Sequence, residues 1–270
     1  MSYDNLFHGN TDTPNHSQWK IKAESLLPDR DVFHTTATKK FPLGARADSR
    51  DGKRWRYCEN GAGALTKGYV NQSAVGSSDW QNQEQTYGVA AAIGDKILNL
   101  NMTATVAKDA FVDGYLTIED GTGDHEMYSV KSNSVGVADD TSGYDFTVEI
   151  ADAGGIRTAT ATTSEVTLTL NKYKDTIVFP TDPTGVCTGV NNVAVAANYF
   201  FWSQVKGPCA CVPDTTAANV VGDMVAAAPN TAGLVGLMDI AADGDVLVGY
   251  VMRAGAHATS ETTLVDLMLE

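Results

Sequence analysis

Cysteine, histidine and long apolar runs are all scarce in this chain of 270 residues. The four cysteines show no zinc-ribbon spacing, and the five histidines form no H-x-x-x-H or H-E-x-x-H pair, so no motif predicts a zinc hydrolase. Neither a G-x-S-x-G nucleophile elbow nor a Walker loop is present. We therefore predict no catalytic residues, no metal and no cofactor, and expect that the protein is not an enzyme.

The longest hydrophobic runs, such as Val193–Ala197, are far too short to span a bilayer. The opening MSYDNLFHGN lacks the basic start and apolar core of a secretion signal. Hydrophobic residues still make up 43% of the chain, which excludes a wholly disordered protein. We expect a protein made in the cytoplasm, with reduced thiols and no membrane partner.

Positive charge is scarce over most of the chain. Residues 1–56 hold ten Lys and Arg against seven Asp and Glu, a net charge of +3, whereas residues 57–270 hold nine against twenty-six, a net charge of −17. So acidic a body argues against a nucleic acid partner, because phosphate binding needs clustered Lys and Arg. The mildly basic leading segment predicts docking on an acidic surface, such as a neighbouring subunit.

Helix signals are nearly absent from residue 97 onwards, where short strands rich in Val, Thr, Ile and Tyr recur between turns. Asp51-Gly52, followed by the alternating KRWRYCE, predicts a hairpin. The fold class we predict is mostly β, with an extended N-terminal arm followed by β-sandwich or barrel modules. The expected parts are an extended arm over 1–40, a β-hairpin segment over 41–96 that packs with the C-terminal barrel, a β-sandwich-like module over 97–178, and a C-terminal β-barrel module over 179–270.

The densest chemical stretch is NYFFWSQVKGPCACV, residues 198–212. Its Lys-Gly-Pro tripeptide at 206–208 predicts a turn that joins an aromatic-rich strand to one lined with small residues. On a strand, Cys209 and Cys211 would lie on one face about 6–7 Å apart, too far for a disulfide with each other. We favour packing in the interior for these sulfurs, while a disulfide with Cys187 or a soft-metal site stays open.

Two other groups of residues have alternative interpretations. The four aromatics at 199–202 suit a core with an interface patch, or a platform on which a sugar could stack. The acidic stretch EDGTGDHE resembles a loose calcium loop, with oxygen ligands from Glu119, Asp120, Asp124 and Glu126. A hairpin turn explains the same letters, since Gly and Asp tolerate positive φ, and we favour the turn.

Four segments follow one another in a recognisable order: FPLGARADSRDGKRWRYCENGAGALTKGYVNQ, GYLTIEDGTGDHEMYSV, GVCTGVNNVAVAANYFFWSQVKGPCACV and, at the end, VLVGYVMRAG with TTLVDLMLE. In this order the chain resembles the capsid decoration (cement) proteins of tailed bacteriophages over roughly residues 41–270. The shared pattern consists of turn glycines and strand alternation. The matching positions are Leu43, Gly44, Asp51, Gly52, Tyr57, Gly68, Gly114, Gly121, Gly123, Tyr128, Gly185, Val186, Trp202, Gln204, Gly207, Gly222, Asp223, Gly233 and Gly249.

The resemblance implies a virion structural protein that binds and stabilises the assembled capsid. The implied partners are the major capsid protein and further copies of the chain, since proteins of this family are often trimers, and the implied location is the outer capsid surface. We predict capsid or subunit contacts from Arg46, Arg50, Lys53, Arg54, Arg56, Trp19 and Phe33, with Tyr199, Phe201 and Trp202 as interface aromatics. Two alternatives stay open: a tail- or fibre-associated phage protein that binds a host surface glycan, and an enzyme with convergent carboxylates or a metal.

Overall fold

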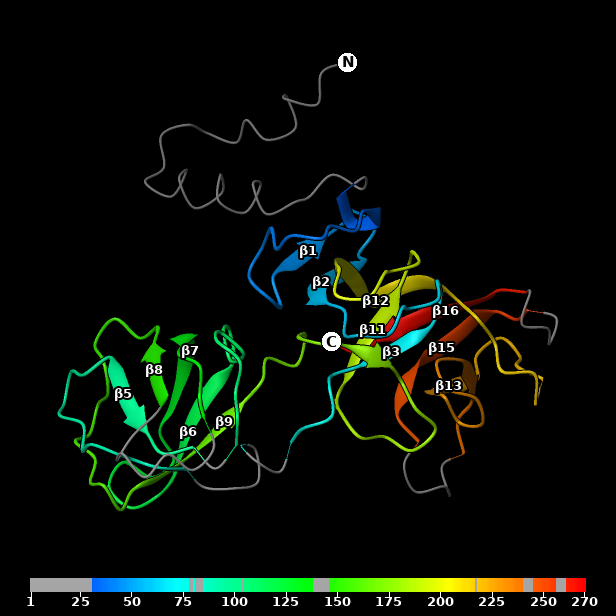
Figure 1. Cartoon of the computed structure of the whole chain (residues 1–270). Coiled ribbons are helices and arrows are strands. Elements are labelled where there is room, and N and C mark those ends of the chain that lie inside the picture. The colour runs from blue at the N-terminus through cyan, green and yellow to red at the C-terminus, as the bar shows by residue number, and fades with distance from the viewer. Residues whose placement is uncertain are drawn as a thin grey trace, which may run out of the picture.

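The computed structural model describes residues 31–77, 80, 85–102, 104–137, 146–216, 218–239, 245–255 and 261–270. This part of the chain is almost entirely β, which confirms the predicted fold class. Its strands form two curled sheets, and the units built on them lie side by side as two lobes (Figure 1). Most of the predicted arm, residues 1–30, lies outside the described residues. No helix in the described ranges is long and apolar enough to cross a membrane.

The larger sheet, which we call the main unit, combines strands from both ends of the described chain. Its strands are β1 (Arg46–Asp48), β2 (Arg54–Glu59), β3 (Val70–Gln72), β10 (Ile177–Val178), β11 (Cys187–Asn191), β12 (Phe200–Cys211), β13 (Met224–Ala227), β14 (Val235–Leu237), β15 (Leu247–Arg253) and β16 (Thr263–Met268). Neighbours follow the order β10-β3-β11-β12-β16-β15-β13-β14, and β1 joins through β2, which pairs with β12. Hydrogen bonds from Val70 N to Gly233 O (2.8 Å) and from Val235 N to Val212 O (3.0 Å) draw the far end of the sheet back towards β3 and β12.

The second sheet, which we call the inserted unit, is one sheet that curls on itself rather than the expected sandwich. Its strands are β4 (Gln85–Thr86), β5 (Ile97–Leu100), β6 (Tyr115–Asp120), β7 (Met127–Asn133), β8 (Phe146–Ile150) and β9 (Glu165–Thr169), in the order β4-β9-β6-β7-β8-β5. Gly88 N donates to Asn99 O, and Asn101 N donates to Thr86 O, both at 2.9 Å. These bonds join the two end strands, so neither presents a long open edge.

The alternation of residue types along the strands explains the two interiors. In β8, Phe146, Val148 and Ile150 are fully buried while the residues between them are half-buried, because successive side chains point to opposite faces. The inserted unit closes around one apolar core. The main unit has two clusters, one aliphatic and lined by β11–β16, the other aromatic and centred on β2 and the start of β12.

The inserted unit enters and leaves the main unit at two neighbouring strands. Gln72 of β3 pairs with Ile177 of β10, so residues 73–176 form an excursion between two adjacent, hydrogen-bonded strands. The structure therefore divides the chain differently from the sequence expectation. β4 and the residues after it, expected with the hairpin segment of 41–96, belong to the inserted unit, while β10, expected with 97–178, belongs to the main unit.

β12 runs through the main unit without the turn expected at 206–208. It is one strand of twelve residues that pairs with β11 and β2 through its first half and with β16 through its second. Gly207 adopts φ +80°, and the register with β2 shifts between Gln204 and Lys206, so the strand bulges instead of reversing. The buried amide of Gln204 donates to the carbonyls of Lys206 (3.0 Å), Gly207 (3.2 Å) and Pro208 (2.9 Å), which satisfies the acceptors that the bulge frees.

Asp113 links the two units. Its carboxylate accepts hydrogen bonds from Lys39 Nζ (2.5 Å) and Leu43 N (3.0 Å), both in the segment before β1. Its carbonyl accepts a bond from Asn171 Nδ2 (2.8 Å), where the chain leaves the inserted unit. Lys174 Nζ adds a 2.7 Å bond to the carbonyl of Ala110.

Candidate functional site

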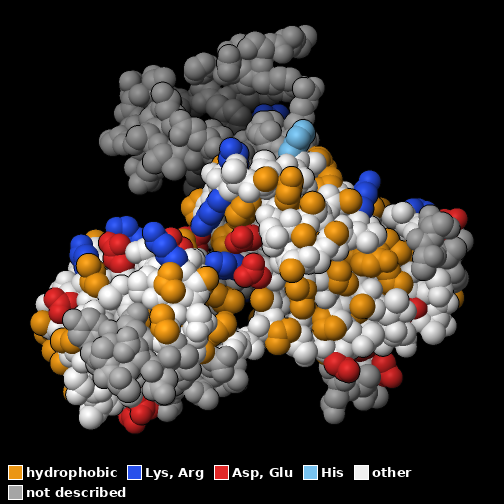
Figure 2. Space-filling view, in the orientation of Figure 1, with side chains coloured by type: hydrophobic (Ala, Val, Ile, Leu, Met, Phe, Trp, Pro, Cys, Tyr) orange, Lys and Arg blue, Asp and Glu red, His pale blue; other side chains and the backbone are white. Residues whose placement is uncertain are grey.

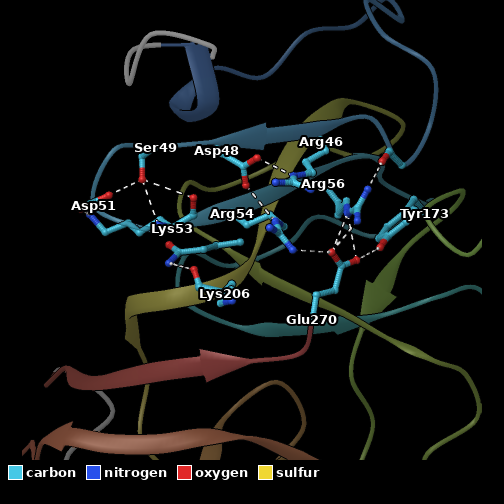
Figure 3. A network of polar contacts seen from close by, with 12 residues as sticks. Arg46, Asp48, Ser49, Asp51, Lys53, Arg54, Arg56, Tyr173, Lys206 and Glu270 are labelled. Carbon is cyan, nitrogen blue, oxygen red and sulfur yellow. Dashed lines mark hydrogen bonds and ion pairs between the residues drawn. The ribbon is translucent and has the colours of Figure 1, made fainter. Parts of the chain in front are cut away.

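The basic residues predicted to make contacts gather on the β1–β2 hairpin (Figure 3). Gly52 adopts φ +89° in the connecting turn, which confirms the hairpin expected from Asp51-Gly52. Acidic side chains separate the cations. Asp48 accepts from Arg46 Nε (2.5 Å) and Arg54 Nε (2.9 Å), and Lys53 Nζ lies 2.7 Å from an Asp51 oxygen.

Arg56 holds a residue far away in the sequence. Its Nε lies 2.9 and 3.0 Å from the two carboxylate oxygens of Glu270, and its Nη2 lies 2.6 Å from one of them. Tyr173 donates its hydroxyl to the same carboxylate at 3.0 Å, and Arg56 Nη1 donates to Gly44 O at 3.0 Å. We call Arg56, Tyr173 and Glu270 the carboxylate clamp. It ties β2, the connection from the inserted unit and the residues after β16 together (Figure 3).

The pKa values of the clamp fit this role. Burial alone would raise the pKa of the Glu270 carboxyl, but the hydrogen bonds from Arg56 and Tyr173 outweigh burial and lower it. The bond to Glu270 raises the pKa of Arg56, and burial with the nearby Glu270 charge raises that of Tyr173. At neutral pH the clamp is a charged arginine and carboxylate with a neutral phenol as donor.

The predicted contact residues therefore divide into two groups. Arg54 and Arg56 have side chains only 22% and 25% exposed and hold the fold together. Arg46, at 51%, and Arg50, on the turn, face solvent, and Phe33 is 48% exposed in the 3-10 turn η2 (Asp31–Phe33). Trp19 lies outside the described residues.

Two of the three predicted interface aromatics are interior residues. Phe201 is fully buried and Trp202 is 3% exposed, whereas Tyr199 is 36% exposed. The reason is that both faces of β12 are covered at this point, since Trp202 packs against Phe41 and Tyr57 with ring centroids 5.4 and 5.1 Å apart. Phe201 and Trp202 are thus corrected from interface residues to core residues.

The cysteine side chains pack in the interior, which is the interpretation that we favoured from the sequence. All four are free thiols, and Cys58, Cys209 and Cys211 are buried, which contradicts the disulfide alternative. Burial raises the pKa of the Cys187 thiol to about 11 and also raises that of Cys58. A hydrogen bond with Cys209, and then burial, raise the pKa of Cys211. The thiols of Cys58, Cys187 and Cys211 are therefore protonated at neutral pH and are poor nucleophiles.

The acidic stretch EDGTGDHE forms a turn whose carboxylates point to separate partners. Asp120 accepts from Gly121 N at 2.6 Å, and Glu126 accepts from Thr158 Oγ1 at 2.7 Å and from the Tyr128 hydroxyl. In the ranges that the structure describes, no three His, Cys, Asp or Glu side chains are placed to hold a metal ion. The turn interpretation accounts for this segment.

A cleft of about 440 Å³ lies where the two units meet, lined by Lys39, Leu43, Glu59, Asp109, Val112, Lys131, Ser132, Lys174 and Phe200. Its lysines already have partners: Lys39 pairs with Asp113, and Lys131 Nζ lies 2.6 Å from a Glu149 oxygen. Burial, and then the charge of Asp175, raise the pKa of Glu59. The cleft is a polar seam between the two packed units. Its lining residues, as the structure describes them, do not bring a nucleophile into contact with a base.

Sequence reasoning missed Tyr173, Glu270 and Asp113. Arg56 and Glu270 are 214 positions apart, and only the pairing of β2 and β16 on opposite sides of β12 brings them together. No local pattern carries that information.

Comparison with known protein families, with curated proteins and with solved structures gave no match.

Proposed function

We propose that this protein binds and stabilises an assembled phage capsid as a decoration or cement protein, without an enzymatic step. The proposed partners are the major capsid protein and further copies of the chain, in a trimer. The observation that carries the proposal is the β1–β2 hairpin, which presents Arg46 on β1 and Arg50 and Lys53 on the turn, in a chain with a net charge of −14. Its position directly after the leading segment suits a contact with an acidic shell.

The hairpin is a rigid support for that contact. Arg54 contacts Asp48, and Arg56 contacts Glu270 in the carboxylate clamp, so both hold strand β2 in place. Because the hairpin backbone is already ordered, little conformational entropy of the backbone is lost on binding. Figure 2 shows Lys and Arg side chains near the seam and along the rim of the inserted unit, while hydrophobic side chains are more abundant on the main unit. Opposite charges at a protein contact steer association and set its salt dependence.

The test uses purified shells that lack their decoration. A charge-reversal variant, Arg46→Glu with Arg50→Glu and Lys53→Glu, should bind shells at least about tenfold more weakly in co-sedimentation and lose its salt dependence. The matched control reverses three exposed lysines elsewhere, Lys67, Lys96 and Lys108, with the same change in net charge. Equal, saturating binding by both variants would refute the hairpin as the contact.

Deleting residues 1–30 tests the leading segment separately. The deletion stops short of Thr36, whose backbone exchanges hydrogen bonds with Phe200, so the main unit keeps that contact. We expect the shortened protein to keep its β circular dichroism and to leave shells at low occupancy. Full occupancy would remove the leading segment from the proposal.

The structure gives no support to the alternative of a tail- or fibre-associated protein that binds a host glycan. It required an exposed aromatic platform around Trp202, and the Trp202 side chain is almost completely buried. We therefore propose no second function.

A further inference from the structure

The outer surface of β15 and β16 carries an unusual amount of exposed apolar side chain. In β16 the inward residues Val265 and Leu267 are buried, while Leu264 is half-buried and Met268 is 56% exposed on the other side. The partner strand β15 exposes Tyr250 at 39% and Met252 at 45%. A sheet face turned to solvent would ordinarily carry polar residues at such positions.

A neighbouring loop extends this surface. Gly222 N donates to Val251 O and Val251 N donates to Asp223 O, both at 2.9 Å, so the loop runs beside β15. Its Val220 and Val221 are 63% and 69% exposed. We call the surface made by Val220, Val221, Tyr250, Met252, Leu264 and Met268 the β15–β16 face. Large exposed apolar patches are rare on soluble monomers and mark interaction sites, so this gathering of exposed apolar residues on neighbouring segments points to a contact surface.

The charges on the β15–β16 face identify its partner. Lys206 lies opposite Met268 in the sheet, Asp266 lies opposite Tyr250, and Arg253 pairs with Leu264. With Asp223 beside β15, the face carries two cations and two carboxylates, so it is close to neutral on a chain of net charge −14. Two copies of so acidic a protein repel each other least through such a face, and its own cations and carboxylates can pair across the contact.

Asp266 supports self-association in a second way. Its carboxylate lies opposite Tyr250 and has no hydrogen bond or ion pair with any residue that the structure describes, and Arg253, among the same residues, donates to the carbonyl of Thr262 at 3.0 Å. Within the described residues, neither group is paired with an opposite charge. Further copies of the chain, two in the proposed trimer, supply both signs together with matching apolar side chains.

We infer that the β15–β16 face is an interface between copies of this chain. The inference rests on the self-association included in the proposed function and not on the capsid contact. Sheet faces of this type are buried with aromatic and methionine side chains at the centre and charged residues at the rim. Tyr250 and Met252 are the central contacts, and Arg253 and Lys206 lie at the edge.

Size-exclusion chromatography with light scattering on the full chain tests the inference. Wild-type protein should have a mass that is a multiple of 28.6 kDa, with an apparent mass that falls on dilution. Met252→Lys and Tyr250→Lys should each raise the dissociation constant at least about tenfold, since each removes an apolar side chain from the contact. Met127→Lys is the matched control, because Met127 is 54% exposed on β7 of the inserted unit.

A second measurement guards against misfolded variants. The thermal midpoint of an associating chain rises with protein concentration, and this dependence should be lost in Met252→Lys and kept in Met127→Lys. A monomeric wild type at about 100 µM, or an oligomer that Met252→Lys and Tyr250→Lys leave intact, would overturn the inference. An oligomer that these variants dissolve, but that fails to bind shells, upholds the interface and refutes only the capsid role.

Discussion

Replacing Glu270 by Gln tests whether the carboxylate clamp holds the main unit together. The substitution keeps the shape of the side chain and removes its charge, so the bidentate contact with Arg56 and the bond from Tyr173 lose their charge assistance. Buried charged hydrogen bonds contribute about 1.5–3 kcal/mol each, whereas exposed ion pairs contribute about 0–1 kcal/mol. Because the Glu270 side chain is 19% exposed, we expect a loss of about 2 kcal/mol.

This loss should be visible in thermal unfolding. For a chain of this length, about 2 kcal/mol corresponds to a decrease of roughly 4–8 °C in Tm, measured by circular dichroism or calorimetry. Glu261→Gln is the matched control, because Glu261 is exposed on the same unit and should change Tm by less than about 1 °C.

The pH dependence gives the decisive readout. The folded pKa of Glu270 is lowered, so its contribution to stability is fully present above the unfolded pKa of about 4.3 and is lost as pH falls through the folded value. The Tm difference between wild type and Glu270→Gln should therefore be constant from pH 6 to 8 and shrink below about pH 4. A difference under 1 °C at pH 7, or one that does not shrink in acid, would refute the clamp.

Three further predictions follow from the packing. Gln204→Leu should cost about 2–4 kcal/mol in urea unfolding, because it removes the amide that donates to the three bulge carbonyls of β12; unchanged stability would contradict that role. Asp113→Ala should loosen the seam between the units, seen as a larger radius of gyration in X-ray scattering and faster proteolysis between residues 73 and 77, and an unchanged radius would count against Asp113 as the link. The buried thiols of Cys58, Cys209 and Cys211 should react with a disulfide reagent only after denaturation, and rapid modification of the native protein would show that the main unit opens readily.

The features that the sequence predicted correctly are local ones. Strands such as β8 can be predicted from the alternation of apolar and polar residues, since Phe146, Val148 and Ile150 all fall on one face. The β1–β2 hairpin follows from a Gly that reaches positive φ after an Asp. The burial of the cysteines follows from their small apolar character among neighbours of the same kind.

The features that the sequence did not predict depend on partners far along the chain. Gly207 and Pro208 are turn residues by type, but the amide of Gln204 and the β16 strand keep β12 continuous through them. The boundary of the inserted unit was misplaced because the partner of β3 is β10, and no local signal at Gln72 indicates a strand that follows 105 positions later. Trp202 was expected at the surface because its covering residues, such as Phe41, come from a separate segment.

The entry and exit of the inserted unit through β3 and β10 has a consequence for folding. Bringing Gln72 and Ile177 together encloses 104 residues, and closing a flexible loop of that length costs about 4 kcal/mol of chain entropy. If the inserted unit is already folded, only its short connections to the main unit remain to be closed, and the same estimate for a loop of about 20 residues falls to about 2.6 kcal/mol. Prior folding of the inserted unit thus lowers the entropy cost of pairing β3 with β10. Mutations in its core should weaken the pairing of β3 with β10 by up to about 1.5 kcal/mol without touching either strand.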